Sequence, residues 1–480
     1  MALRTANIVG SGPNGLSAAV TLAQCGIAVT VFERNERIGG ACSTAELTLP
    51  GFRNDVGSSS FPMGVASPFF RSLPLEEFGL RWIQPPAPLA HPLDDGTAVT
   101  LEHDVEATAA QFGEHDARAW RALMGPSVRD WPQLVDAVMQ PWMGLPQRLD
   151  TMASFGSVAL FPARGLARAV FREERARTLF AGVAAHAVIP LTQVASSATG
   201  LVLATAAHTT GWPVAAGGAQ GITQALAGLL RSLGGRIVVD FEVCGLGELE
   251  RLNAADVTLF DTSPEAMAAI AGDALTQNFR ARLRRFRRGP GIFKVDYALR
   301  RPIPWTAAGC ARAATVHLGG SLEEIVASEA DAFAGRDNDR PFVIVVQPSL
   351  FDPERAPVAE DGSAQHTAWA YCHVPSGSDE DRTAVIEGQM ERFAPGFADC
   401  VLARRSWGAS ALQCLNPNLE AGDISGGAMT LEQLVARPTL RGYRTSNRAL
   451  YLCSSSTAPG GGVHGMCGYN AALAALEDWG

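Results

Sequence analysis

The sequence predicts an α/β fold with a parallel sheet, interrupted by an inserted α+β domain. Two observations favour this fold class. A glycine-rich turn at residues 10–15 lies between an apolar run at 6–9 and a helix-like stretch at 16–24, and a second apolar run at 28–32 ends on Glu33. Strand and helix patterns recur near the middle and the end of the chain, so the elements of one βαβ-type domain are separated along the sequence.

The turn at residues 10–15 has the spacing of a dinucleotide-binding loop. Gly10 allows the tight turn, Gly12 lets the backbone approach a pyrophosphate, and Gly15 lets the helix pack against the strand. The N–H groups at the start of the helix suit phosphates. Glu33, eighteen residues after Gly15, suits the ribose hydroxyls of an adenosine and would repel a 2′-phosphate. A glycine-rich turn alone is weak evidence, but here strand, helix, strand and acid occur in register.

Composition and charge narrow the classes of protein. The 480 residues are 47% apolar and 18% charged, which predicts a folded protein of two or three domains. A net charge of −9 gives nucleic-acid binding no electrostatic support. No apolar run reaches the roughly 18–20 residues of a membrane span, and the first strand begins too early for a signal peptide. The nine cysteines include no Cys-x-x-Cys pair, so we expect reduced thiols in a cytoplasmic protein without a metal site.

The rest of the chain alternates between two kinds of block. Residues 85–92 are proline-rich and predict an irregular crossover, and helical patterns fill residues 105–203, with breaks near Pro132, Pro141, Pro146 and Pro162. Strands are predicted at 236–243, 257–260, 291–299, 342–346, 367–372 and 449–453, and helices at 222–233 and 466–476. We therefore predict a discontinuous nucleotide-binding domain (1–84, 205–290 and 415–480) and a substrate domain (85–204 and 291–414). No second glycine motif of this kind follows a strand, which predicts one dinucleotide pocket.

Several stretches resemble known flavoproteins. Residues 33–41 resemble the extended FAD motif of the glutathione-reductase-like flavoproteins, and residues 451–465 resemble the closing motif of the phytoene-desaturase-like flavoproteins. Residues 51–57, 289–299 and 422–427 fit the same group. The resemblance implies a Rossmann-like FAD-binding domain of the glutathione-reductase-2 type with an inserted α+β substrate domain, and FAD as the cofactor.

The resemblance also implies which residues contact FAD. Glu33 would hold the adenosine ribose, Val243 would pair its backbone with the adenine edge, and the turn before the last helix would lie under the pyrimidine end of the flavin. The implied contacts are Gly10, Gly12, Pro13, Asn14, Gly15, Glu33, Arg34, Gly39, Gly40, Ala41, Cys42, Gly57, Ser58, Val243, Ser454, Gly462, His464, Gly465 and Met466. Ser454 stands where the family usually has glycine. Residues 57–60 lack the aromatic positions common in carotenoid desaturases.

Three residues are candidates for catalysis. Lys294, the single lysine of the chain, resembles the lysine that contacts flavin N5 through a water in amine oxidases; the alternative is a strand-edge lysine in solvent. His464 lies in the flavin-proximal turn and suits acid/base chemistry near pH 7, although turn histidines are commonly held by backbone groups. His208 is expected near a cleft between domains, as is His186, but a lone histidine among apolar residues is more often part of the core. Trp212 is the better candidate for a cavity wall.

The resemblance predicts an FAD-dependent oxidoreductase that takes hydride from a C–H bond of an apolar or mixed-polarity small molecule. With one dinucleotide pocket, oxygen or a quinone is the expected electron acceptor. The alternatives are an amine oxidase, a redox-neutral double-bond isomerase and a non-catalytic flavin-binding partner. Lys294 supports the amine oxidase, while an aromatic content of 7% opposes it. The arginines of residues 282–288 admit peripheral contact with anionic lipid, but such a run is usually a solvated helix face.

Overall fold

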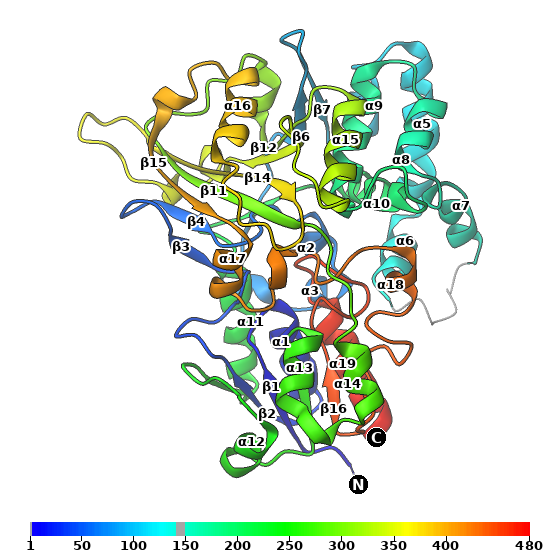
Figure 1. Cartoon of the computed structure of the whole chain (residues 1–480), viewed down its shortest axis with the longest axis vertical. Helices are drawn as coiled ribbons and strands as arrows, with labels where there is room; N and C mark the ends of the chain where they lie inside the picture. Colours follow the sequence, from blue (N-terminus) through cyan, green and yellow to red (C-terminus); the bar gives the residue numbers. More distant parts are fainter. Residues whose placement is uncertain (1, 141–148) are drawn as a thin grey trace.

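The N-terminal βαβ unit belongs to a parallel sheet of five strands in the computed structural model, which describes residues 2–140 and 149–480 (Figure 1). In spatial order the strands are β16 (Leu450–Leu452), β10 (Val257–Phe260), β1 (Thr5–Val9), β2 (Ala28–Phe32) and β9 (Arg236–Val238). Every neighbouring pair runs parallel, and α1 (Pro13–Gln24) connects β1 to β2. The predicted α/β fold with a Rossmann-type sheet is confirmed.

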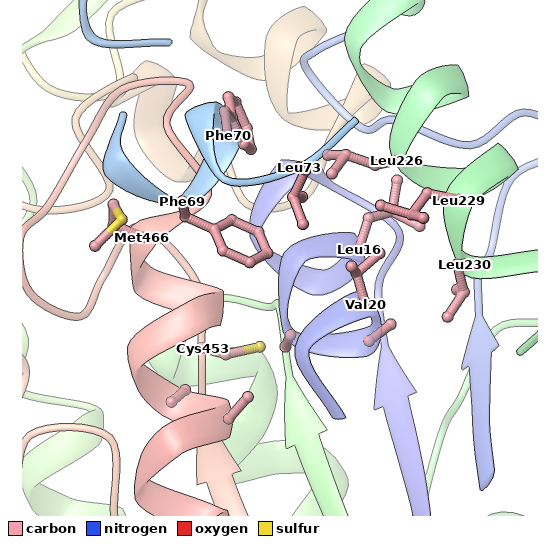
Figure 2. Packing of buried hydrophobic residues seen from close by; sticks show 14 of the residues in the cluster. Leu16, Val20, Phe69, Phe70, Leu73, Leu226, Leu229, Leu230, Cys453 and Met466 are labelled. Carbon is pink, nitrogen blue, oxygen red and sulfur yellow. The ribbon is translucent and has the colours of Figure 1, made fainter. Parts of the chain in front are cut away.

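Helix α1 is packed between two other helices, which hold it in place on the sheet. Leu16 and Val20, one turn apart and fully buried, face the side where α11 (Gln220–Ser232) packs (Figure 2). On its other side α1 packs against α19 (Met466–Trp479). Burying each such aliphatic side chain stabilises the fold by about 1.5–3 kcal/mol, so the glycine-rich turn before α1 rests on a rigid support. The other helices near this sheet are α12 (Leu246–Leu252), α13 (Pro264–Ala271) and α14 (Gln277–Leu283).

The second sheet is mixed and has seven strands. In spatial order they are β15 (Val401–Trp407), β11 (Gly291–Leu299), β14 (His366–Val374), β13 (Val343–Val346), β12 (Ala313–Leu318), β6 (Ala87–Pro92) and β7 (Ala98–Leu101). His317, Ile344, Tyr371 and Lys294 are register partners in successive strands, from β12 to β11, so they form one row on one face. Two short ribbons, β3 (Thr44–Glu46) with β4 (Arg53–Asp55) and β5 (Trp82–Ile83) with β8 (Val214–Ala215), complete the sheets.

Helices cover the second sheet and the region beside it. Those in the predicted helical block are α4 (Val105–Ala109), α5 (Glu114–Arg129), α6 (Trp131–Val138), α7 (Leu149–Ala159), α8 (Ala163–Val170), α9 (Glu174–Ala184), the 3₁₀ turn η2 (Ala185–Ala187) and α10 (Ser196–Thr209). Pro132 lies in the first turn of α6 and Pro162 directly precedes α8, as predicted, whereas Pro141 and Pro146 lie outside the described residues. The remaining α-helices are α2 (Pro62–Ala66), α3 (Pro68–Arg71), α15 (Leu322–Phe333), α16 (Thr383–Phe393), α17 (Ala409–Leu415) and α18 (Leu431–Val435).

The predicted crossover at residues 85–92 is wrong, because residues 87–92 form the buried strand β6. Proline disfavours a strand interior since it lacks an N–H donor. Pro88 is tolerated here because pairing with β7 begins one residue later, at Leu89. The apolar side chains around it were a strand signal that the prolines obscured.

The predicted strand at 236–243 is too long, because β9 ends at Val238. Asp240 has a positive φ of 53°, which turns the chain away from the sheet. The N–H groups of Asp240 and Phe241 then donate to the carbonyl groups of Asn35 and Glu33, at 3.1 and 2.9 Å. The segment that follows β9 therefore runs beside the loop after β2 and carries Val243 with it.

The strands of each sheet come from separated parts of the sequence. Those of the parallel sheet lie within residues 5–32, 236–260 and 450–452, and those of the mixed sheet within 87–101 and 291–407. The limits of the two domains stay a prediction. Among the described residues, no helix has the length and apolar character that crossing a membrane requires.

Candidate active site

A cavity of about 1470 Å³ is lined from both sheets. On one side lie the glycine-rich turn and the ends of β2 and β10, where Glu33 and Asp261 are found. On the other side lies one face of the mixed sheet, which contributes Ile292, Lys294, Thr315, Ile344, Val346, Trp369 and Tyr371. The glycine-rich turn and this face of the mixed sheet thus line one continuous space, the kind of place where ligands commonly bind.

The glycine-rich turn brings the backbone close to the end of β10. Gly10 has a φ of 100°, which side chains other than glycine rarely adopt. A Cβ on Gly12 would lie 2.5 Å from Oδ2 of Asp261, and one on Gly15 would lie 2.2 Å from the carbonyl oxygen of Gly10. All three positions therefore require glycine, and the approach of a pyrophosphate to Gly12 stays a prediction.

Glu33 is held in a fixed position at the end of β2. Its Oε2 accepts hydrogen bonds from the backbone N–H and hydroxyl of Ser11, at 3.0 and 2.6 Å, and its Oε1 accepts from the N–H of Asn35 at 3.0 Å. The side chain is buried, yet it lines the cavity. Arg34 also lines the cavity and lies 3.4 Å from Glu242 in an exposed ion pair. This geometry suits the recognition of ribose hydroxyls.

Asp261 is a site residue that the sequence analysis missed. Its Oδ2 accepts the backbone N–H of Gly15 at 2.8 Å, at the N-terminus of α1. Burial raises the pKa of this carboxyl to about 7, against the effect of that hydrogen bond, and the charge of Glu33 raises it further. The signal was present in the sequence, because an acid directly after a predicted strand lies at the carboxyl edge of the sheet, where ligands bind.

Most of the predicted cofactor contacts lie on the cavity wall. They are Gly10, Gly12, Pro13, Asn14, Glu33, Arg34, Gly40, Ala41, Cys42, Gly57, Ser58, Val243, Gly462, His464 and Met466. Their binding roles stay predictions. The structure places Gly15, Gly39, Ser454 and Gly465 behind the wall. For example, the N–H of Gly39 donates to Oγ of Ser11. A Cβ on Gly465 would lie 2.2 Å from Oγ of Ser17, so the absence of a side chain at Gly465 lets α19 start beside α1.

The turn before α19 holds His464 through backbone groups. Its Nδ1 accepts the N–H of Met466 at 3.1 Å, and its carbonyl oxygen accepts the hydroxyl of Ser67 at 2.7 Å. Burial lowers the pKa of His464 to about 4, so the ring is neutral at pH 7. With Nδ1 accepting, the proton is on Nε2. This arrangement does not support an acid/base role near pH 7, and leaves His464 as a neutral hydrogen-bond donor beside the cavity.

Lys294 is buried within the sheet face that lines the cavity, not solvated at a strand edge. Its Nζ donates to the two carboxylate oxygens of Asp296 at 2.8 and 2.7 Å and to the carbonyl oxygen of Asp55 at 2.9 Å. The ammonium group also lies 5.0 Å from the ring centre of Trp369. Burial raises the pKa of Asp296, although Lys294 and the indole N–H of Trp407 oppose the shift.

A second buried ion pair supports this wall from behind. Arg355 is fully buried, and its guanidinium lies 2.9 Å from carboxylate oxygens of both Asp55 and Asp352. Burial alone would raise the pKa of Asp55, but Arg355 and the hydrogen bonds from Ser59 and Ala219 hold it below its ordinary value. This network fixes the Asp55 carbonyl oxygen to which Lys294 donates.

The structure does not support a catalytic role for His208. Its Nε2 accepts the indole N–H of Trp120 at 3.2 Å, and burial lowers its pKa to about 4. His208 does not line the cavity, since it lies on the side of α10 that packs against α5. By contrast, His186 and Trp212 both line the cavity, and Trp212 is confirmed as a wall residue.

An aromatic pair on β14 was not anticipated. The rings of Trp369 and Tyr371 stack with centroids 5.5 Å apart and an angle of 24° between them, and both line the cavity. The indole N–H of Trp369 donates to Oγ of Ser59 at 2.7 Å. The predicted strand at 367–372 contained this signal, because residues two positions apart in a strand share a face.

Two of the five arginines at residues 282–288 are already paired with acids. Arg288 lies 2.5 Å from Glu265 and 2.6 Å from Glu420, and Arg287 lies 2.6 Å from Glu432. This weakens the case for lipid contact by the cluster. In the chain as described, no group of three or more His, Cys, Asp or Glu side chains has the arrangement needed to hold a metal ion.

Comparisons with known proteins agree with this geometry. Residues 8–73 match the family model described as an NAD(P)-binding Rossmann-like domain. Across 98% of this chain and 93% of the relative, the sequence is 26% identical to pyridine nucleotide-disulfide oxidoreductase domain-containing protein 2 of Mus musculus. A carotenoid 3,4-desaturase of Haloarcula japonica is 34% identical over 24% of this chain and 23% of its own.

A solved structure extends the similarity to the whole fold. A putrescine oxidase double mutant superposes with a TM-score of 0.62 at 15% sequence identity, over 99% of this chain and 98% of that chain. The chain is distantly related to the carotenoid desaturases and shares its fold with the flavin amine oxidases. The comparisons thus show a Rossmann-type dinucleotide-binding unit within a fold that the putrescine oxidase shares.

Proposed function

We propose that this chain binds FAD in the cavity and takes hydride from a C–H bond of a small apolar or mixed-polarity molecule. One observation carries the proposal: the cavity is lined both by the dinucleotide loop and by the sheet face that holds Lys294 and Trp369. A dinucleotide bound along the loop would share the same space with a substrate on that face.

The residues on the first side fit the adenosine and pyrophosphate of FAD. The start of α1 offers backbone N–H groups and the positive end of a helix dipole, and Gly12 leaves room for close approach. The fixed carboxylate of Glu33 suits ribose hydroxyls and disfavours a 2′-phosphate. Asp261 fits a bound anion when protonated, and its raised pKa of about 7 makes that form accessible.

FAD, when bound, supplies an acceptor for hydride at its N5 atom. The chain's own groups bind, orient and exclude water. Lys294, held by Asp296 and the Asp55 carbonyl oxygen, presents a positive charge on the wall that would orient water or oxygen. Neutral His464 and the N-terminus of α19 offer dipoles that stabilise negative charge. Oxygen or a quinone remains the proposed acceptor.

An amine oxidase is the second candidate. The stacked pair Trp369 and Tyr371 and the fold shared with putrescine oxidase favour it. A carboxylate on the same face, Asp296, is already paired with Lys294, so it does not provide a free counter-charge for an ammonium group. This favours oxidation of C–C over C–N bonds. The open cavity disfavours a non-catalytic flavin-binding partner, which would have a cleft closed by large side chains.

The test is to incubate the FAD-loaded protein in air with terpenoids, polyenes, alcohols and amines, and to follow products by mass spectrometry. The proposal predicts a product that has lost two hydrogens and kept its carbon skeleton, with hydrogen peroxide formed or an added quinone reduced. Aldehyde and ammonia from amines alone would establish the amine oxidase. A product of unchanged mass would indicate the isomerase.

A further inference from the structure

We infer that the substrate chamber contains a subsite for a neutral oxygen atom of the substrate, built by His186 and Trp212. The inference rests on the proposed function and names the substrate class that it leaves open: an otherwise apolar molecule with a hydroxyl or carbonyl oxygen. Both residues line the cavity, His186 from η2 and Trp212 from the segment after α10, with their ring centres 5.8 Å apart.

His186 is oriented by a buried partner. Its Nε2 lies 3.0 Å from Nε2 of His317, which is fully buried on β12. No residue in the described parts of the chain bonds Nδ1 of His186, and this atom is not sealed from the cavity, unlike Nδ1 of His317 and both ring nitrogens of His91. Nδ1 is therefore the nitrogen that a ligand can reach.

The histidine pair is neutral. Burial lowers the pKa of His186 to about 3 and that of His317 well below its ordinary value. The nearby groups are neutral His91 and the buried pair of His373 and Glu329, in which a carboxylate oxygen of Glu329 lies 2.8 Å from His373 Nδ1. A neutral imidazole has one donor and one acceptor, and the contact between the two Nε2 atoms uses one of each. Nδ1 of His186 is a donor in one arrangement of protons and an acceptor in the other, which suits a hydroxyl group.

Trp212 provides an independent reason for an oxygen. It is 2% exposed, and its indole N–H finds no acceptor within residues 2–140 and 149–480. This nitrogen is enclosed like the ring nitrogens of His91, so a ligand reaches it only where the indole ring shifts. Indole can only donate, so a ligand that satisfies it must carry an acceptor. An alcohol or carbonyl oxygen does so, whereas a hydrocarbon and a protonated amine do not. A buried donor left without a partner weakens binding of ligands that lack the acceptor.

The subsite lies far from Lys294 along the sheet. His186 contacts His317, which lies at one end of the row of register partners. Lys294 lies at the other end, three strand spacings or about 14 Å away. Ile344 and Tyr371 lie between them. A substrate that reaches both places has an apolar stretch in the middle and its oxygen remote from the reacting bond. His186 is therefore a positioning residue.

The experiment measures binding of farnesol, farnesene and farnesylamine to the FAD-loaded protein, from the change in the flavin absorbance spectrum. These probes share a chain and differ in the polar group. We expect farnesol to bind at least about tenfold more tightly than the other two, which is the scale of one or two hydrogen bonds. His186→Phe and Trp212→Phe keep an aromatic ring and should remove the preference, while His186→Asn should restore part of it. Ile344→Val is the matched control and should affect all three ligands alike.

Flavin content and melting temperature, measured for each variant, show whether the variant has folded. Equal binding of the three probes, no binding of farnesol, or a preference that survives both phenylalanine variants would overturn the inference. A protein that takes up no FAD fails the proposed function itself. If substrates reduce the flavin but the probe with a hydroxyl group binds no more tightly than the other two, this inference alone is contradicted.

Discussion

Nζ of Lys294 lies within 2.8 Å of both carboxylate oxygens of Asp296, two positions along the same buried face of β11. The exposed fractions of the two residues are 1% and 0%. A buried ion pair adds little net stability by itself, but breaking it leaves one charge without its partner. The pair therefore keeps the ammonium group of Lys294 on the cavity wall. Only the close geometry and the hydrogen bonds of the pair offset the free energy of burying the two charges.

We expect Lys294→Met to slow the reaction of the reduced protein with oxygen by at least about tenfold, because it removes the positive charge that we propose orients water or oxygen. Loss of the partner of Asp296 should also lower the free energy of unfolding by about 3–5 kcal/mol. Stopped-flow absorbance measures the first effect and urea denaturation the second.

The double substitution of Lys294→Met and Asp296→Asn separates chemistry from folding. It removes both charges, so most of the lost stability should return, while reoxidation stays slow. If reoxidation recovers together with stability, Lys294 has a structural role only.

Gly12→Ala should weaken FAD binding by at least about tenfold, because its Cβ would lie 2.5 Å from Asp261 and would obstruct the approach of a pyrophosphate. Gly125→Ala is the matched control, since a Cβ there meets nothing within 4 Å. Fluorescence titration with FAD measures both variants. Wild-type affinity in Gly12→Ala would show that the pyrophosphate does not lie against this turn.

Asp261→Asn should stabilise the protein at high pH. The folded-state pKa of about 7 exceeds the ordinary 3.8, so the unfolded chain loses its proton first and stability falls as pH rises from about 4 to about 7. Since a difference of one in a pKa corresponds to about 1.36 kcal/mol, the gain should reach at most about 4 kcal/mol at pH 8. Little change is expected at pH 4. Thermal unfolding at both pH values tests this, and an equal effect at both would refute it.

Buried neutral histidines should make the protein sensitive to acid. Burial lowers the pKa of His91 to about 4, so between about pH 6.5 and 4 the unfolded chain takes up a proton that the folded chain does not, and stability falls as pH falls. His91→Leu should therefore stabilise by about 2 kcal/mol more at pH 5 than at pH 8. Urea denaturation at the two pH values gives the difference. A variant equally affected at both would mean that His91 is not buried and neutral.

Local patterns predicted the βαβ unit well. The order of strand, glycine turn, helix and strand is encoded in consecutive residues, and β1, α1 and β2 lie where these patterns indicate. The predictions were wrong where contacts between residues far apart in the sequence determine the secondary structure. Residues 87–92 form a strand because β12 and β7 pair with it, and β9 stops at Val238 because the chain turns toward Glu33.

Most residues predicted for the dinucleotide side line the cavity, and so do Lys294, His186 and Trp212, which were predicted for the substrate side; the rest of that side was missed. Glu33 and the glycines belong to one short motif. His186 and His317 are 131 positions apart, and the row from His317 to Lys294 is created only by strand pairing. No local pattern identifies such a wall. Tyr371 and Trp369 could have been predicted as wall residues from the alternation of side chains along a strand. Asp261 could have been predicted from its place directly after a strand.

The decisive measurement is the absorbance of the FAD-loaded protein under anaerobic conditions, titrated with matched hydrocarbons, alcohols and amines. We expect the protein to retain about one FAD per chain and an oxygen-bearing apolar compound to bleach its flavin band. A protein that cannot take up FAD, or a flavin that is bleached by amines alone, would contradict this expectation.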